Sequence, residues 1–345
     1  MRKLALISTF FFLAVAVIAC QSQKKELENN LTVKDNGVFG CDTKIYEDEE
    51  ENVMYLFFKS ANDGGLIRMS NADGTPKLST SSSDETIKLM DDENFDSYSR
   101  IYEDTEENVM YLYCKNEYSD DIEVMKNSDG ALKLSSNSDY ETIDIKNLNR
   151  FKGYFKIYED TEENVMYLFF KAGYNSKIMV MPSKDGTPKL SNCTKYETID
   201  MKKPGILDGT LNVYVDPEED VMYLYCKNGR DSGAVMMVTS EGLPKKSKDS
   251  SYKTTTIEAS KQVYVNEKTS KMYLTLKVEN SGEIIEMKNT NGNPKTIQNS
   301  KYEAKNINEL FESGGTSKIC IDEENGVNYL FYKDGYDGNI ISMTN

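Results

Sequence analysis

The chain has 345 residues, with 57 acidic against 41 basic side chains and a formal charge of −16 at neutral pH. This balance leaves no basic stripe for phosphate contacts, which argues against broad nucleic-acid binding. The sequence contains no histidine, and this excludes Ser-His-Asp and Cys-His nucleophile systems together with the commonest zinc sites. A chain of this length predicts two domains or a repeat array.

The first residues have the pattern of an export signal. A short basic start precedes an almost wholly apolar run over 4–18, which is too short for a comfortable membrane span but suits a signal peptide. The run ends in VIAC at 17–20, which resembles the lipobox of bacterial lipoproteins. The resemblance implies a signal peptide over 1–19, lipidation of Cys20, and a polar tether over 20–27.

Acyl chains on Cys20 would anchor the protein to a membrane of the bacterial cell envelope, facing either the periplasm or the cell surface. Cleavage before Cys20 removes two basic residues and no acidic one, so the formal charge changes from −16 to −18. An acidic body is repelled by anionic headgroups, and we expect it to stand off the lipid surface.

The remainder, residues 28–345, repeats one unit six times. Residues 101–112 and 157–168 both read IYEDTEENVMYL, and residues 45–56 differ from them only at Glu49. The second tyrosine of this motif forms a column, followed at the same intervals by a methionine column. These columns are Tyr55, Tyr111, Tyr167, Tyr223, Tyr273 and Tyr329, then Met69, Met125, Met181, Met237, Met287 and Met343. The repeat cores lie near 44–79, 100–135, 156–191, 212–246, 262–297 and 318–345.

Each unit predicts β-structure throughout. KIYED predicts a short strand, and the E-E-N that comes after it predicts a polar turn. VMYLFFK then predicts a strand that is apolar on both faces. A second apolar strand such as 177–181 leads to an Asp-Gly turn such as 185–186, and a final strand such as YETIDIK (140–146) ends the unit. Apolar residues on both faces predict a sheet covered on both sides by neighbouring units, with the tyrosine and methionine columns in the core.

The two ends of the domain favour a closed ring. Leu31 lies in the same position as Ile87, Ile143 and Ile199, so residues 28–34 read as a copy of the final strand, which the last unit lacks. An N-terminal strand that completes the last unit would remove two sheet edges. We therefore predict an all-β six-bladed propeller-like ring; the alternative is a linear array of tandem small β domains.

Segments such as 319–343, ICIDEENGVNYLFYKDGYDGNIISM, resemble a short bacterial β-domain family of unknown function. The resemblance covers most of residues 28–345 as repeats. It implies kinship of fold and no activity.

The five cysteines after Cys20 show no tight spacing and predict no disulfide framework. Cys114 and Cys226 occupy a repeat position that holds Phe58 and Phe170 in other copies, so we expect them to be small core hydrophobes.

The acidic turns are the first candidates for chemistry. Calcium prefers six to eight oxygen ligands, and clustered carboxylates supply oxygen, although the strict calcium-loop motif is absent. The weak calcium candidates are Glu47, Asp48, Glu103, Asp104, Glu159 and Asp160. A solvated hairpin turn is the favoured interpretation, and a catalytic carboxylate pair is the least favoured, because six near-equivalent turns do not single out one pair. The Asp-Gly turns are better explained as hairpin corners than as calcium loops.

Three tyrosines in the variable loops, Tyr118, Tyr174 and Tyr336, are the candidate ligand contacts. They share one repeat position, in loops that would gather on one face of a ring. The leading hypothesis is a non-enzymatic, lipid-anchored scaffold that binds protein or glycan and needs no cofactor. The alternatives are a structural spacer or adhesin stalk, and a carboxylate-based propeller hydrolase. A unique polar cluster would favour an enzyme, and the sequence shows none.

Overall fold

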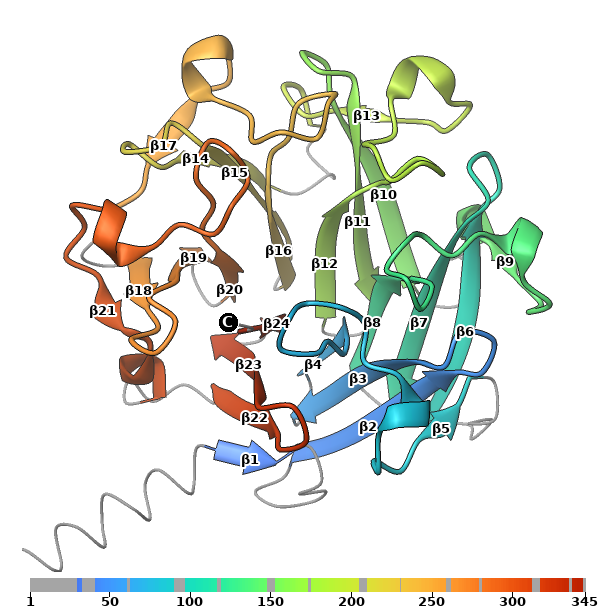
Figure 1. Cartoon of the computed structure of the whole chain (residues 1–345). Coiled ribbons are helices and arrows are strands. Elements are labelled where there is room, and N and C mark those ends of the chain that lie inside the picture. The colour runs from blue at the N-terminus through green and yellow to red at the C-terminus, as the bar shows by residue number, and fades with distance from the viewer. Residues whose placement is uncertain are drawn as a thin grey trace, which may run out of the picture.

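The computed structural model describes residues 30–32, 41–60, 63–89, 97–116, 119–147, 153–172, 175–204, 210–229, 231–258, 262–278, 281–311, 317–334 and 337–343. They form six four-stranded sheets arranged as the blades of a closed ring (Figure 1). The predicted six-bladed propeller is therefore confirmed, and the alternative of a linear array is wrong.

Every blade follows the same strand order. In blade 1 the order from centre to rim is β4 (Asp63–Arg68), β3 (Val53–Ser60), β2 (Cys41–Asp48) and β5 (Ile87–Lys88). The three inner strands are antiparallel, and the outermost strand pairs in parallel with its neighbour. Blade 2 consists of β8 (Ser119–Val124), β7 (Val109–Asn116), β6 (Ser97–Asp104) and β9 (Ile143–Asp144).

The other blades repeat this order. Blade 3 consists of β12 (Asn175–Val180), β11 (Val165–Ala172), β10 (Gly153–Asp160) and β13 (Ile199–Asp200). Blade 4 consists of β16 (Asp231–Met236), β15 (Met222–Asn228), β14 (Thr210–Val215) and β17 (Thr254–Thr256). Blade 5 consists of β20 (Ser281–Glu286), β19 (Met272–Val278), β18 (Val263–Val265) and β21 (Lys305–Asn306). Blade 6 consists of β24 (Asp337–Ser342), β23 (Val327–Asp334), β22 (Lys318–Asp322) and β1 (Asn30–Thr32).

The ring is closed by the N-terminal strand, as predicted. β1 pairs in parallel with β22, with Leu31 opposite Cys320. This is the register in which Ile87 of β5 lies opposite Tyr46 of β2. The N-terminal strand therefore supplies the outermost strand of blade 6 and protects an edge that would otherwise be open.

The predicted final strand of each unit is shorter than expected. Residues 140–146 were expected to be extended, but β9 contains only Ile143 and Asp144, and a 3-10 turn over Ser135–Asn137 precedes it. Tyr140 lies outside the strand, because its hydroxyl accepts a hydrogen bond from the backbone N–H of Glu49 in blade 1. The contact with the neighbouring blade takes precedence over strand pairing here.

Burial follows the predicted columns. The second tyrosine of every unit is completely buried, and the methionine column is between 0% and 4% exposed. Tyr55 and Phe57 of β3 pack against blade 2, whereas Leu56 and Phe58 pack against blade 6. Both faces of the strand are covered, and each such side chain contributes roughly 1.5–3 kcal/mol through burial. Cys114 and Cys226 are buried in the core, as predicted.

The turns use residues that tolerate a positive φ. The acidic turn ends at Asn52 in blade 1 with φ of 57°, and at Gly326 in blade 6 with φ of 69°. Gly74 at the Asp-Gly corner has φ of 83°, and Asp73 accepts hydrogen bonds from the backbone and hydroxyl of Thr75. The Asp-Gly segments are therefore hairpin corners, as predicted.

Within the residues that the structure describes, no helix has the length and apolarity that a membrane span requires. Residues 1–29, which contain the predicted signal, the tether and Cys20, lie outside the described part of the chain.

Candidate functional site

The acidic turns connect neighbouring blades. Asp48, at the end of β2, lies 2.6 Å from the ammonium group of Lys133 in blade 2, and their side chains are 0% and 2% exposed. The same buried pair recurs at four more junctions: Asp104–Lys189, Asp160–Lys245, Asp216–Lys295 and Asp322–Lys77. The prediction of a solvated turn is wrong for these aspartates, because each carboxylate is buried against the next blade.

At the same five junctions a glutamate of the turn extends this contact. Glu106 accepts hydrogen bonds from the Thr194 hydroxyl and the Lys195 backbone N–H, and it lies 2.9 Å from Lys189. Burial alone would raise the pKa of Glu106, but the hydrogen bonds from Thr194 and Lys189 lower it to about 2. The glutamate is therefore ionised at neutral pH and holds the connecting segment of blade 3 in place.

In blades 1 to 3 the glutamate that precedes the buried aspartate makes its contacts within its own blade. Glu47 accepts hydrogen bonds from the hydroxyl groups of Ser79 and Thr86. Glu103 and Glu159 make the same pair of contacts in blades 2 and 3. Calcium binding at these turns stays a prediction, and an ion would have to compete with hydroxyl and ammonium partners already in place.

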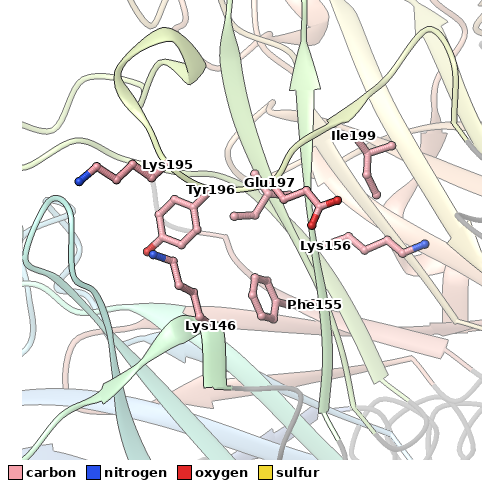
Figure 2. A pocket seen from close by; sticks show the side chains of 8 residues that line it. Lys146, Phe155, Lys156, Lys195, Tyr196, Glu197 and Ile199 are labelled. Atoms are coloured by element: carbon pink, nitrogen blue, oxygen red, sulfur yellow. The ribbon is translucent and has the colours of Figure 1, made fainter.

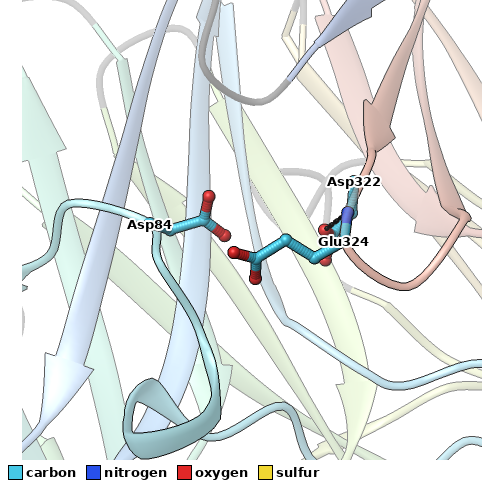
Figure 3. Close-up of side chains that lie close together, drawn as sticks. All are labelled: Asp84, Asp322 and Glu324. Carbon is cyan, nitrogen blue, oxygen red and sulfur yellow. Dashed lines mark hydrogen bonds between the residues drawn. The ribbon is translucent and has the colours of Figure 1, made fainter.

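The junction that closes the ring departs from the pattern. Tyr196 donates a hydrogen bond of 2.8 Å to Asp104, but the equivalent position between blades 6 and 1 is Asp84. Figure 3 shows Asp84, Asp322 and Glu324 together, with their oxygen atoms within 4.8 Å of one another. The ammonium of Lys77 lies 2.8, 2.8 and 2.9 Å from these three carboxylates. A cation therefore already occupies the group, and that cation is the lysine.

The acidic residues near the ring axis are also paired. Asp121 of β8 accepts a hydrogen bond of 2.6 Å from the backbone N–H of Leu66 in β4. Lys177 of β12 donates to the carbonyl oxygen of Leu66 and lies 3.5 Å from Asp121. Lys177 also binds Glu123. These carboxylates connect three blades across the centre of the ring.

Blades 2 and 3 share the motif IYEDTEENVMYL, but polar residues that the other units lack lie at their junction. The Tyr113 hydroxyl donates a buried hydrogen bond of 3.0 Å to Asp120, and Arg100 lies 4.6 Å from the ring centre of Tyr98. The position of Asp120 holds glycine or serine in the other units: Gly64, Ser176, Ser232, Gly282 and Gly338. The structure thus contains a non-repeating polar cluster, although the sequence showed none. Burial raises the pKa of Tyr113, so its hydroxyl stays protonated and able to donate.

A pocket of about 390 Å³ lies at this same junction (Figure 2). Its lining comes from the end of blade 2, from β10, and from the segment before β13. The lining residues are Lys146, Phe155, Lys156, Ile157, Lys195, Tyr196, Glu197 and Ile199. Phe155 and Tyr98 both pack against the hydrophobic core between blades 2 and 3, which contains Tyr113, so the pocket and the non-repeating cluster border the same core. Its size suits a small ligand or a short segment of a larger one.

Tyr196 organises one side of the pocket. Its hydroxyl is bound to Asp104, and its ring centre lies 4.3 Å from the Lys146 ammonium and 4.5 Å from that of Lys189. The hydrogen bond and the two cation–π contacts hold the ring in one orientation. In Figure 2 the ring of Phe155 lies between Lys146 and the carboxylate of Glu197.

The sequence did not single out the pocket residues. The available signal was divergence between units: Lys195 replaces Asp139 and Ser251, and Phe155 replaces Ser99 and Leu211. Tyr118, Tyr174 and Tyr336 lie outside the described residues. The residues that flank them pair at equivalent hairpin ends, Asn116 with Ser119, Ala172 with Asn175 and Asp334 with Asp337.

Comparison of the chain with protein-family models finds no match, and a search of curated proteins finds no similar sequence.

Proposed function

We propose that the protein is a lipid-anchored component of the bacterial cell envelope whose propeller binds a glycan at the pocket between blades 2 and 3. The observation that carries the proposal is that this pocket lies at the junction where Phe155 and Lys195 replace the residues of the neighbouring units. Blades 2 and 3 share the motif IYEDTEENVMYL, so these replacements make the pocket different from the equivalent surfaces beside it.

The lining of the pocket supports a saccharide more than a protein partner. Phe155 offers a half-buried aromatic ring to the apolar face of a sugar, and Glu197 is an exposed acceptor for hydroxyl groups. Pockets of this size with aromatic walls and a few polar groups are typical small-ligand sites. A protein ligand would need a larger surface, and the loops that carry Tyr118, Tyr174 and Tyr336 are its proposed contacts.

The anchor is supported by VIAC at 17–20 and the apolar run before it. Acyl chains on Cys20 would tether the acidic ring to the membrane, with residues 20–27 as the spacer.

Binding is favoured over hydrolysis by the composition of the pocket. Glycoside hydrolysis commonly uses two carboxyl groups at a defined separation. Glu197 is the one carboxylate among the described residues that line this pocket. The hypothesis of a structural spacer required an elongated array of units. Because β1 closes the units into a ring, the fold does not support that hypothesis.

Two measurements test the proposal. Mass spectrometry of the membrane-extracted protein should find an acylated N-terminal Cys20, and an intact unmodified N-terminus would contradict the anchor. A glycan array should show binding that Phe155→Ala abolishes. The matched control is Leu211→Ala, which alters the same repeat position in blade 4. Equal loss of binding in both variants, or in neither, would argue against the pocket.

A further inference from the structure

Lys146 contacts its surroundings differently from its counterpart one blade further along the ring. Lys202, 56 residues later, lies 2.8 Å from Glu162 and donates a hydrogen bond of 2.9 Å to the Ser251 hydroxyl. Lys146 lies over the Tyr196 ring, 4.3 Å from its centre, as Lys202 lies over the Tyr252 ring at 5.1 Å, so the two lysines differ in their polar partners. Within the described residues its ammonium forms no ion pair.

The junction between blades 2 and 3 differs from the junction between blades 3 and 4 in one residue near this lysine, where Lys195 stands in place of Ser251. Ser251 accepts a hydrogen bond from Lys202 and donates one to Glu162, so it joins the two charges. At the equivalent position in blade 3 the chain has Lys195, whose side chain has no acceptor and cannot form this bridge. Glu106, the counterpart of Glu162, is bound by Thr194, by the Lys195 backbone and by Lys189, whereas Glu162 is bound by the Ser251 backbone, by Lys245 and also by Lys202.

The ammonium groups of Lys146 and Lys195 therefore carry positive charge that no carboxylate among the described residues neutralises through an ion pair. Lys146 and Lys195 are both exposed and both line the pocket. A lysine ammonium carries three donors, and a contact with an aromatic face leaves them free to bind an anion. On a chain with a formal charge of −16, this is a local basic site next to an aromatic wall.

We propose that the pocket is selective for acidic saccharides, with Lys146 binding the carboxylate or sulfate of the sugar. This inference rests on the proposed glycan-binding function and adds the chemical class of the ligand. Phe155 supports the face of the sugar ring, and Glu197 accepts a hydroxyl group. In the view of Figure 2, Lys146 and the Glu197 carboxylate lie on opposite sides of Phe155. The position of Glu197 orients the ligand, because its charge repels the acidic group toward Lys146 and Lys195.

The test is calorimetric titration of the whole chain in detergent with three probes. These are trigalacturonic acid, its fully methyl-esterified and therefore neutral form, and a sulfated disaccharide, which separates a carboxylate from a sulfate as the acidic group. Lys146→Gln should weaken binding of the acidic probe at least tenfold. Lys146→Arg keeps the charge and should stay within about threefold of the parent affinity. Lys202→Gln, the matched control, should leave the affinity unchanged.

Three results would overturn the inference. The methyl ester could bind as tightly as the acid, Lys146→Gln could bind like the parent, or Lys202→Gln could lose as much affinity as Lys146→Gln. If a neutral glycan binds in a Phe155-dependent way and neither acidic probe does, the proposed function stands and the selectivity for acidic sugars is wrong. If no glycan binds in either the array or the titration, both fail.

Discussion

The ammonium of Lys189 lies 2.7 Å from Asp104 Oδ2, although the two residues belong to different blades and are 85 positions apart in the chain. Their side chains are 1% and 0% exposed. A buried ion pair contributes little net stability relative to a well-packed apolar pair, but removing one partner leaves a charge that neither water nor protein compensates. The pairs therefore determine how neighbouring blades are aligned.

Lys189→Met should destabilise the ring by about 3–5 kcal/mol, because Asp104 is left buried without its cation. The double variant Lys189→Met with Asp104→Leu should recover much of this loss. Urea denaturation of the three proteins measures the effect. A natural precedent exists in blade 5, where Asn266 replaces the aspartate and faces the sulfur of Met343 at 4.0 Å. A double variant no more stable than the single one would contradict this interpretation.

Tyr167 and Tyr111 occupy equivalent positions in the tyrosine column, but only one of their hydroxyl groups has a hydrogen-bond partner in the described structure. The Tyr167 hydroxyl accepts a hydrogen bond of 3.1 Å from the backbone N–H of Val238 in the next blade. The residue in the same position opposite Tyr111 is Pro182, which has no N–H, and the buried Tyr111 hydroxyl has no partner in the described structure. Tyr167→Phe should therefore cost about 1–3 kcal/mol, whereas Tyr111→Phe should be neutral or stabilising. Thermal unfolding distinguishes the two, and equal losses would show that the hydrogen bond is not the cause.

Asp84→Tyr should stabilise the closing junction. The change removes one of three carboxylates around Lys77 and supplies the hydroxyl that Tyr196 supplies to Asp104. We expect a gain of about 1.5–3 kcal/mol, the size of a hydrogen bond to a charged group. The measurement is the denaturation midpoint at neutral pH. Asp84→Asn serves as the control for charge alone, and a loss of stability in the tyrosine variant would show that Asp84 itself is needed for closure.

We expect the stability of the folded protein to fall in acid, because the turn glutamates act in their ionised form. The pKa of Glu106 is lowered from its ordinary value of 4.5 to about 2, so its folded state favours the ionised form. Its contribution to stability is fully present above pH 4.5 and is lost as the pH falls toward 2. The difference in unfolding free energy between the parent protein and Glu106→Gln should shrink across this interval. Melting curves between pH 2 and 7 measure it, and a difference that grows on acidification would contradict the assignment.

The repeat made much of the fold predictable. Alternating apolar residues in VMYLFFK required cover on both faces, and the position of Leu31 indicated the closing strand; the structure confirms both. The predicted length of the final strand was wrong, because local β-propensity carries no information about a contact with another blade such as the hydrogen bond between Tyr140 and Glu49. The calcium candidates and the lipidated Cys20 stay predictions.

The sequence by itself determined the number of blades, the succession of strands along the chain and the buried columns, because these depend on a period-two pattern and on recurrence at fixed spacing. Only the tertiary structure decided what the polar residues do. Asp48 and Lys133 are 85 positions apart, and Lys146 and Tyr196 come from different blades. The angle between neighbouring blades brings such groups together, and burial then selects the pairs whose charges compensate. Lys146 at the pocket has no carboxylate partner among the residues that the structure describes.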